Sequence, residues 1–234
     1  MVINPLVRRR VAVLIATALI ASSAGGTRAA VVPESPCQTA IEVSSTIELN
    51  WTPEDVDRFR HEAERAWTAL GVDICWRDAR TPCRHAATTL YVRVAEDVPA
   101  AEPTTCRVLG WIGFSDSRGP GPFIVLSVGR AVDLLRRAER AARRLADLPG
   151  MVERLLPRAL GRALAHELGH YLLARRGHSP AGLMRGAFRP EDLADEGVGQ
   201  RMHLTARDAR TLAERCAPRA LGLTADAAPA GPSR

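Results

Sequence analysis

Residues 163–186 read ALAHELGHYLLARRGHSPAGLMRG and contain the most informative motif of the chain. It places His166 and His170 four positions apart, with Glu167 directly after the first histidine. On a helix, residues four apart lie on the same side, one turn above the other. Two imidazoles in that arrangement can hold one zinc ion, and the glutamate beside them is placed to act as a base.

A third protein ligand is expected, because a catalytic zinc site uses three and leaves one position open. After His170 the sequence can continue the helix for almost two turns, and Gly177 can then end it in the left-handed conformation. His178 follows at once, where a reversed chain can return toward the metal, so it is the preferred third ligand. The weaker candidates are His203 and an acidic residue, namely Glu191, Asp192 or Glu196.

This stretch resembles the metzincin clan of zinc metalloproteases, especially its matrixin-like branch. The clan pattern is HExxHxxGxxH, followed by a methionine-containing turn that lies beneath the metal. Here HELGH is followed by Gly-His-Ser and Gly-Leu-Met, with seven residues instead of five between the second and third histidines. The same layout resembles uncharacterised exported bacterial proteins. The resemblance implies zinc (Zn2+) on His166, His170 and His178, with Met184 as the apolar floor.

The function that the resemblance implies is zinc-dependent endopeptidase activity on a peptide or protein substrate. Glu167 would be the general base that takes a proton from the attacking water and passes it to the leaving amine. Arg185 and His203 are the candidates for stabilising the oxyanion. The substrate would bind along an edge strand, for which 109–114 and 123–128 are candidates. The alternative is a noncatalytic secreted binding domain in which zinc holds the C-terminal segment in place.

The order of predicted elements indicates an α+β fold of the zincin type. It comprises a small mixed sheet, a backing helix, the HExxH helix and a C-terminal helical subdomain. Strands are predicted at 47–49, 72–76, 88–95, 109–114 and 122–128. Helices are predicted from Pro53 to about 70 with Thr52 as N-cap, at 132–148, from 151 through the motif, and at 204–216 with Thr205 as cap.

The N-terminus is typical of an export signal. Three arginines precede a short apolar run at 11–21, and small residues that suit cleavage follow it. We therefore expect a signal peptide at 1–29, a single metalloprotease domain at 30–216 and a flexible tail at 217–234. The mature chain would be secreted or periplasmic, with no stable membrane partner. The alternative is an uncleaved membrane anchor.

Net charge and cysteine content further narrow the kinds of protein to which this chain could belong. The full chain carries a net charge of +6, but the first 29 residues hold four arginines and no acid, which leaves +2 for the mature chain. That balance gives no support for a nucleic-acid partner. Five cysteines in an exported protein favour disulfides over metal ligation, and the odd number leaves one outside any pairing within the chain.

Overall fold

The protein is described here by a computed structural model covering residues 39–77, 86, 88–96, 108–116, 119–142, 150–194 and 202–216. These residues belong to one compact unit of the chain, 34–234. The predicted signal peptide at 1–29 and tail at 217–234 lie outside the described residues and stay predictions. No helix among the described residues is long and apolar enough to cross a membrane.

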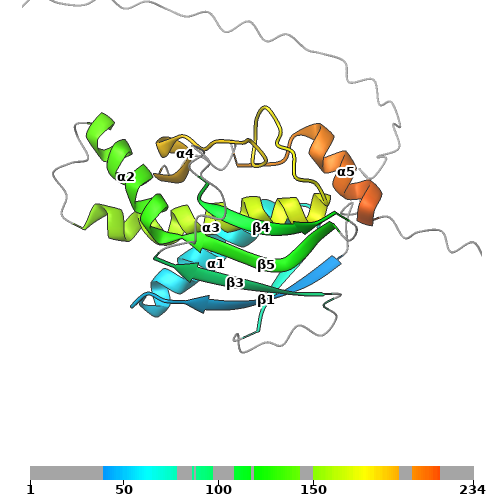
Figure 1. Ribbon diagram of the computed structural model, residues 1–234, viewed down its shortest axis with the longest axis horizontal. Coiled ribbons are helices and arrows are strands. Elements are labelled where there is room, and N and C mark those ends of the chain that lie inside the picture. Colours follow the sequence, from blue (N-terminus) through cyan, green and yellow to red (C-terminus); the bar gives the residue numbers. More distant parts are fainter. Residues whose placement is uncertain are drawn as a thin grey trace, which may run out of the picture. The chain divides into compact units, whose positions relative to one another are not determined.

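A five-stranded mixed sheet forms the framework, with the strand order β2-β1-β3-β5-β4 (Figure 1). The first four strands in that order run parallel to one another, and β4 pairs antiparallel with β5 at the edge. The sheet is therefore mixed, as predicted, and mostly parallel. Its strands are β1 (Thr39–Ile47), β2 (Val72–Trp76), β3 (Thr88–Ala95), β4 (Gly110–Ser115) and β5 (Gly119–Ser127).

The first strand was predicted in the wrong place. β1 spans Thr39–Ile47, whereas the sequence pattern indicated 47–49. Ile41 and Val43 are buried in β1, which pairs with β2 on one side and β3 on the other. Beyond the strand, the Glu48 N–H still donates to the Val94 carbonyl at 3.0 Å. Ladders on both sides outweigh the weak strand preference of the polar residues in this segment.

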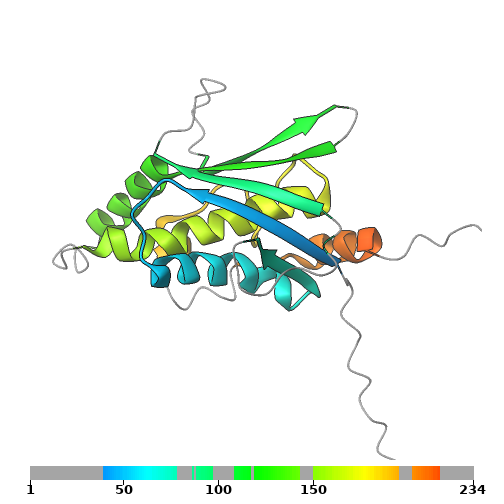
Figure 2. The same ribbon diagram turned by 90° about the horizontal axis from the view of Figure 1, so that it is seen from below.

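Two long helices, α1 (Pro53–Thr68) and α3 (Met151–Leu173), pack against one face of the sheet (Figure 2). Thr52 caps α1 as predicted, because its hydroxyl accepts from the Asp55 N–H at 3.2 Å. From Leu156 onward nearly every residue of α3 is buried, including the polar ones. A helix that is covered on all sides is a rigid base for side chains that have to hold fixed positions.

The remaining helices are α2 (Val128–Ala142), α4 (Pro190–Ala194) and α5 (Ala206–Cys216). α2 follows β5 directly and starts four residues earlier than predicted; the Gly129 N–H donates to the Glu96 carbonyl at its start. The predicted Thr205 cap of α5 is present, with the Asp208 N–H donating to the Thr205 hydroxyl at 3.2 Å. All three helices contact α3, and α3 also contacts β4. Figure 1 shows α2, α4 and α5 on the same side of the sheet as α3.

A buried ion pair joins three of the helices. Arg162 of α3 lies 2.9 Å from Glu62 of α1 and donates to the Asp192 carbonyl of α4 at 2.8 Å. Burial lowers the pKa of Arg162, and the Glu62 carboxylate acts in the opposite direction. Glu62 also lies 3.4 Å from Arg158 and 3.8 Å from Arg65. Removal of Glu62 therefore leaves the charge of Arg162 uncompensated in the interior, so this carboxylate helps to hold α1, α3 and α4 in one arrangement.

Candidate metal centre

α3 presents the first two histidines of the motif side by side. The Nε2 atoms of His166 and His170 lie 3.1 Å apart, and both side chains are buried. This is the arrangement that four-residue spacing predicts. Two nitrogens bound to one zinc ion at tetrahedral angles are about 3.3 Å apart, given Zn–N distances of about 2.0–2.1 Å.

The helix ends earlier than predicted. α3 stops at Leu173, and Ala174 takes the left-handed conformation with φ 47°. Gly177 does not have a positive φ, so the prediction that it ends the helix is wrong. The left-handed conformation is unfavourable for alanine by about 1–2 kcal/mol. Hydrogen bonds from Ala174 N–H and Arg175 N–H to the last carbonyls of the helix support this ending.

The early ending lets the chain turn back, and His178 comes to the two helix histidines. Its ring centroid is 5.2 Å from that of His166 and 4.9 Å from that of His170. Each of the three residues offers a ligand atom within 4.8 Å of the others. Among the described residues, this is the one group of three or more potential ligand residues that could hold a metal ion.

Backbone carbonyls fix the orientation of the two helix imidazoles. His166 Nδ1 lies 2.7 Å from the Leu183 carbonyl oxygen, and His170 Nδ1 lies 2.8 Å from that of Arg175. A carbonyl only accepts, so each Nδ1 carries the proton and each neutral ring leaves a bare lone pair on Nε2. Two lone pairs facing each other at 3.1 Å have no proton between them. A cation bound there satisfies both, and this donor set suits zinc.

Burial keeps these rings neutral, as metal ligation requires. It lowers the pKa of His166 to about 3, against the opposing effect of the Leu183 carbonyl. The pKa values of His170 and His178 are also lowered. Burial is the main cause for His170, whereas His178 is an exposed side chain, and for it partial desolvation of the ring acts together with the nearby charge of Arg175. The three imidazoles are therefore available as lone-pair donors at neutral pH.

Glu167 lies next to the histidine cluster, in the same cavity and almost completely enclosed. Its side chain is 5% exposed, and burial raises its pKa to about 8. A cation held by the neighbouring imidazoles would favour the ionised carboxylate and would oppose this rise in pKa. Such a carboxyl group can change its protonation state when its surroundings change, which is the property that a general base needs.

The loop that carries His178 is anchored from α5. Asp208 is fully buried and lies 2.6 Å from the Arg175 guanidinium, and it accepts from the Ser179 hydroxyl at 2.8 and 2.9 Å. Arg175 also supplies the carbonyl that orients His170, and Ser179 directly follows His178. The anchor thus holds both ends of the loop. Nothing in the sequence near the motif points to Asp208.

Met184 packs beneath the motif helix. It is fully buried, and a Cβ on Gly169 would collide with its sulfur, so the glycine provides the space for it. The Ser179 N–H donates to the Met184 carbonyl at 2.6 Å, which closes the turn after His178. Met184 therefore packs against α3 at Gly169, between the two histidines, and its role as an apolar floor beneath the metal stays a prediction.

The other candidate ligands lie elsewhere. Asp192 is buried and bonded to Arg185 at 2.7 Å, while Glu191 and His203 are exposed. None of these three belongs to the histidine group. Glu196 lies outside the described residues. Of the two candidates for the oxyanion, Arg185 lines the cavity beside the histidines and His203 is not among its lining residues.

A cavity of about 980 Å³ opens beside the histidines. Its walls are β4, the motif face of α3 and the segment from Arg185 to Pro190. β4 is an edge strand, whereas β5 pairs on both sides, so the proposal of 123–128 as a substrate-binding edge is wrong. Among the described residues no strand pairs with the other side of β4, so that side can add an extended peptide as a further strand.

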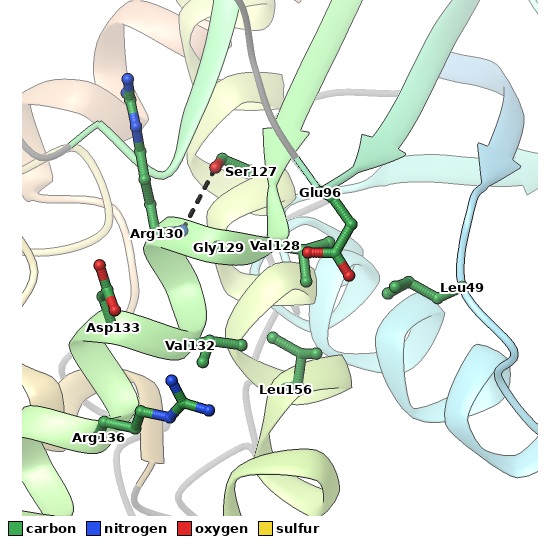
Figure 3. A pocket seen from close by; sticks show the side chains of 10 residues that line it. All are labelled: Leu49, Glu96, Ser127, Val128, Gly129, Arg130, Val132, Asp133, Arg136 and Leu156. Carbon is green, nitrogen blue, oxygen red and sulfur yellow. Dashed lines mark hydrogen bonds between the residues drawn. The ribbon is translucent and has the colours of Figure 1, made fainter.

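A second cavity, of about 600 Å³, lies near the start of α2 (Figure 3). It mixes charges of both signs, from Glu96, Asp133, Arg130 and Arg136, around apolar side chains that include Leu49 and Leu156. It shares no lining residue with the cavity at the histidines. No group of three or more potential metal ligands lies there among the described residues.

The structure describes two of the five cysteines, and neither belongs to the histidine group. Cys75 of β2 and Cys216 of α5 are in disulfide bonds. Cys37, Cys83 and Cys106 lie outside the described residues, so the expectation that one of the five cysteines stays outside any pairing within the chain remains a prediction.

Comparison with known proteins gives little independent information. No protein-family model matches the sequence, and no curated protein matches it. Among solved structures, the chain is similar to archaemetzincin from Methanopyrus kandleri, with 16% sequence identity and a TM-score of 0.40. That match covers 79% of this chain and 98% of the archaemetzincin chain. A likeness at this TM-score carries no conclusion about activity, which has to come from the site itself.

Proposed function

We propose that this chain is a zinc-dependent endopeptidase. His166, His170 and His178 would hold the metal, and Glu167 would serve as the general base. The observation that carries the proposal is the convergence of the His166 and His170 Nε2 lone pairs at 3.1 Å, with both opposite ring nitrogens committed to carbonyl oxygens. While both rings are neutral, no proton lies between the two Nε2 atoms, and a metal cation can bind both lone pairs.

The surroundings favour a catalytic over a purely structural metal. The described residues offer three ligands, and the cavity reaches them from solvent. Structural zinc sites are closed by four protein ligands, whereas catalytic sites keep one position open. A bound zinc ion supplies a Lewis acid that stabilises negative charge developing on the scissile carbonyl.

The protein groups would divide the remaining work. The edge of β4 would hold an extended peptide across the cavity by main-chain hydrogen bonds. Glu167 would take a proton from the attacking water and deliver it to the leaving amine. The carbonyls of Leu183 and Arg175 would keep the imidazoles from rotating out of place.

The test compares the mature wild-type chain with Glu167→Ala. We expect about one zinc per chain in both proteins by elemental analysis, chelator-sensitive cleavage of a peptide library by the wild type, and a loss of about 10²–10⁴-fold in the variant. Cleavage retained by Glu167→Ala would contradict the assignment of the base. Bound zinc with no cleavage by the wild type, and unfolding on chelation, would favour the noncatalytic binding domain instead.

We also propose that the mature chain acts outside the cytoplasm, on the basis of the N-terminal sequence pattern. Expression of the full chain followed by cell fractionation and N-terminal sequencing tests this. The expected result is a processed chain in the periplasm or medium that begins after position 24 or 29. An unprocessed chain in the membrane fraction would support the uncleaved anchor.

A further inference from the structure

The cavity at the histidines has a strongly uneven charge. Among its lining residues the one carboxylate is Glu167, which the proposed mechanism uses. The cations in the lining are four arginines, Arg137, Arg176, Arg185 and Arg189. A cleft lined by one sign of charge attracts ligand groups of the opposite sign.

Two of these arginines already have partners. Arg185 lies 2.7 Å from the buried Asp192, and Arg176 lies 2.8 Å from the exposed Asp116. For Arg137 and Arg189, no ion pair links the side chain to a carboxylate in the part of the chain that the structure describes. These two guanidinium groups are therefore the ones available to a substrate.

Arg137 and Arg189 come from elements that pack together. Arg137 belongs to α2, Arg189 directly precedes α4, and α2 and α4 are in contact. The same part of the lining includes Leu134, one helical turn from Arg137, and Ala163, one turn before Glu167 on α3. Phe188, the residue before Arg189, adds an aromatic wall. This end of the cleft thus combines apolar surface with two cationic groups.

We propose that this end of the cleft binds a carboxylate of the peptide substrate between Arg137 and Arg189, so that the enzyme prefers acidic peptides. This inference rests on the proposed endopeptidase function. Guanidinium groups bind carboxylates through charge-assisted and bidentate hydrogen bonds, and the apolar surface suits the stem of a glutamate side chain. A C-terminal α-carboxylate has the same chemistry, and the two sources call for separate substrates.

The experiment uses three peptides that share one scissile sequence. One carries glutamate near the cleavage site and an amidated C-terminus, one carries glutamine there with the same amide, and one carries glutamine with a free C-terminal carboxylate. We expect the wild type to cleave one of the two peptides that carry a carboxylate with a kcat/KM about five- to tenfold higher than that for the neutral peptide. This factor corresponds to the free energy of a partly exposed ion pair. The preference should shrink with added salt.

The variant that tests the residues is the double substitution Arg137→Gln with Arg189→Gln. It should bring the three peptides to similar kcat/KM. The matched control is Arg136→Gln, which removes one positive charge from the same helix but faces the other cavity. It should keep the preference.

The outcomes separate this inference from the function on which it rests. Cleavage of all three peptides at equal rates by the wild type overturns the acidic preference and leaves the endopeptidase intact. A preference that survives in the double variant overturns the assignment to Arg137 and Arg189. A wild type that cleaves no peptide in a library overturns the endopeptidase, and the preference with it.

Discussion

Gly110 of the edge strand lies directly against Glu167 of the motif helix. A Cβ at position 110 would come within 2.8 Å of Glu167 Cγ and 2.9 Å of its Oε1. The absence of a side chain at 110 is therefore what allows the carboxyl group to sit between α3 and β4. This close contact sets the position of Glu167, the proposed base, relative to β4, the strand proposed to bind the substrate.

Gly110→Ala is expected to displace the Glu167 carboxylate and lower kcat by at least tenfold, with zinc content unchanged. The physical reason is that the new methyl group overlaps the carboxylate and the Leu126 side chain, and a misplaced base loses much of its effect. Peptidase kinetics and elemental analysis check this. Gly113→Ala in the same strand meets only the exposed Trp111 side chain and should keep most of the activity.

His178→Ala is expected to weaken zinc binding by several orders of magnitude, because two imidazoles remain where three converge. His203→Ala, the other histidine considered as third ligand, should bind zinc like the wild type, since its side chain is exposed and outside the cluster. Competition with a chromogenic chelator measures both. Equal affinities in the two variants would show that His178 is not a ligand.

Asp208→Asn is expected to weaken zinc binding by about 10–100-fold while the chain still folds, because the anchor of the loop that carries His178 is lost. Circular dichroism and chelator competition together separate the metal effect from unfolding. Glu214→Gln, an exposed charge change on the same helix, is the control and should change neither. A purely structural role would instead lower stability and leave the zinc affinity of the folded chain unaltered.

Asp208 also predicts a pH dependence of stability. Burial by itself raises its pKa, but hydrogen bonds from Ser179 and Thr205 and the charge of Arg175 outweigh this and hold the pKa below the usual value. A carboxylate with a lowered pKa stabilises the fold fully above its unfolded pKa, about 3.9, and loses that contribution as pH falls toward the folded pKa. Urea unfolding of the zinc-free chain should give the wild type a free energy of unfolding about 1–3 kcal/mol higher than that of Asp208→Asn near pH 6. This difference should disappear as the pH falls below about 4.

Glu62→Gln is expected to lower the free energy of unfolding by about 3 kcal/mol, because it leaves Arg162 charged and uncompensated in the interior. Urea denaturation measures the change. The comparison is Glu54→Gln, which breaks the exposed pair with Arg58 and should cost less than about 0.5 kcal/mol. Similar losses in the two variants would show that the buried pair is not a distinctive support of the fold.

Several local features of this protein could be predicted from its sequence. Strands at 72–76 and 88–95 were predicted with their observed bounds, since alternating apolar residues and adjacent turn signals define them without help from distant segments. The Thr52 cap and the one-turn spacing of His166 and His170 are likewise properties of short segments. Helical periodicity alone was enough to put both histidines and Glu167 on one helix.

The assembly of those residues into a site depends on contacts between segments that lie far apart in the chain. Ala174 rather than Gly177 ends α3, and the segment that follows is held by Asp208 from α5, far along the chain. β4 rather than β5 forms the edge beside Glu167, because strand order depends on long-range pairing. The carbonyls of Leu183 and Arg175 that orient the imidazoles carry no sequence signal, since every residue has a carbonyl. Short-range spacing thus placed the helix histidines and Glu167, and long-range packing brought His178 to them.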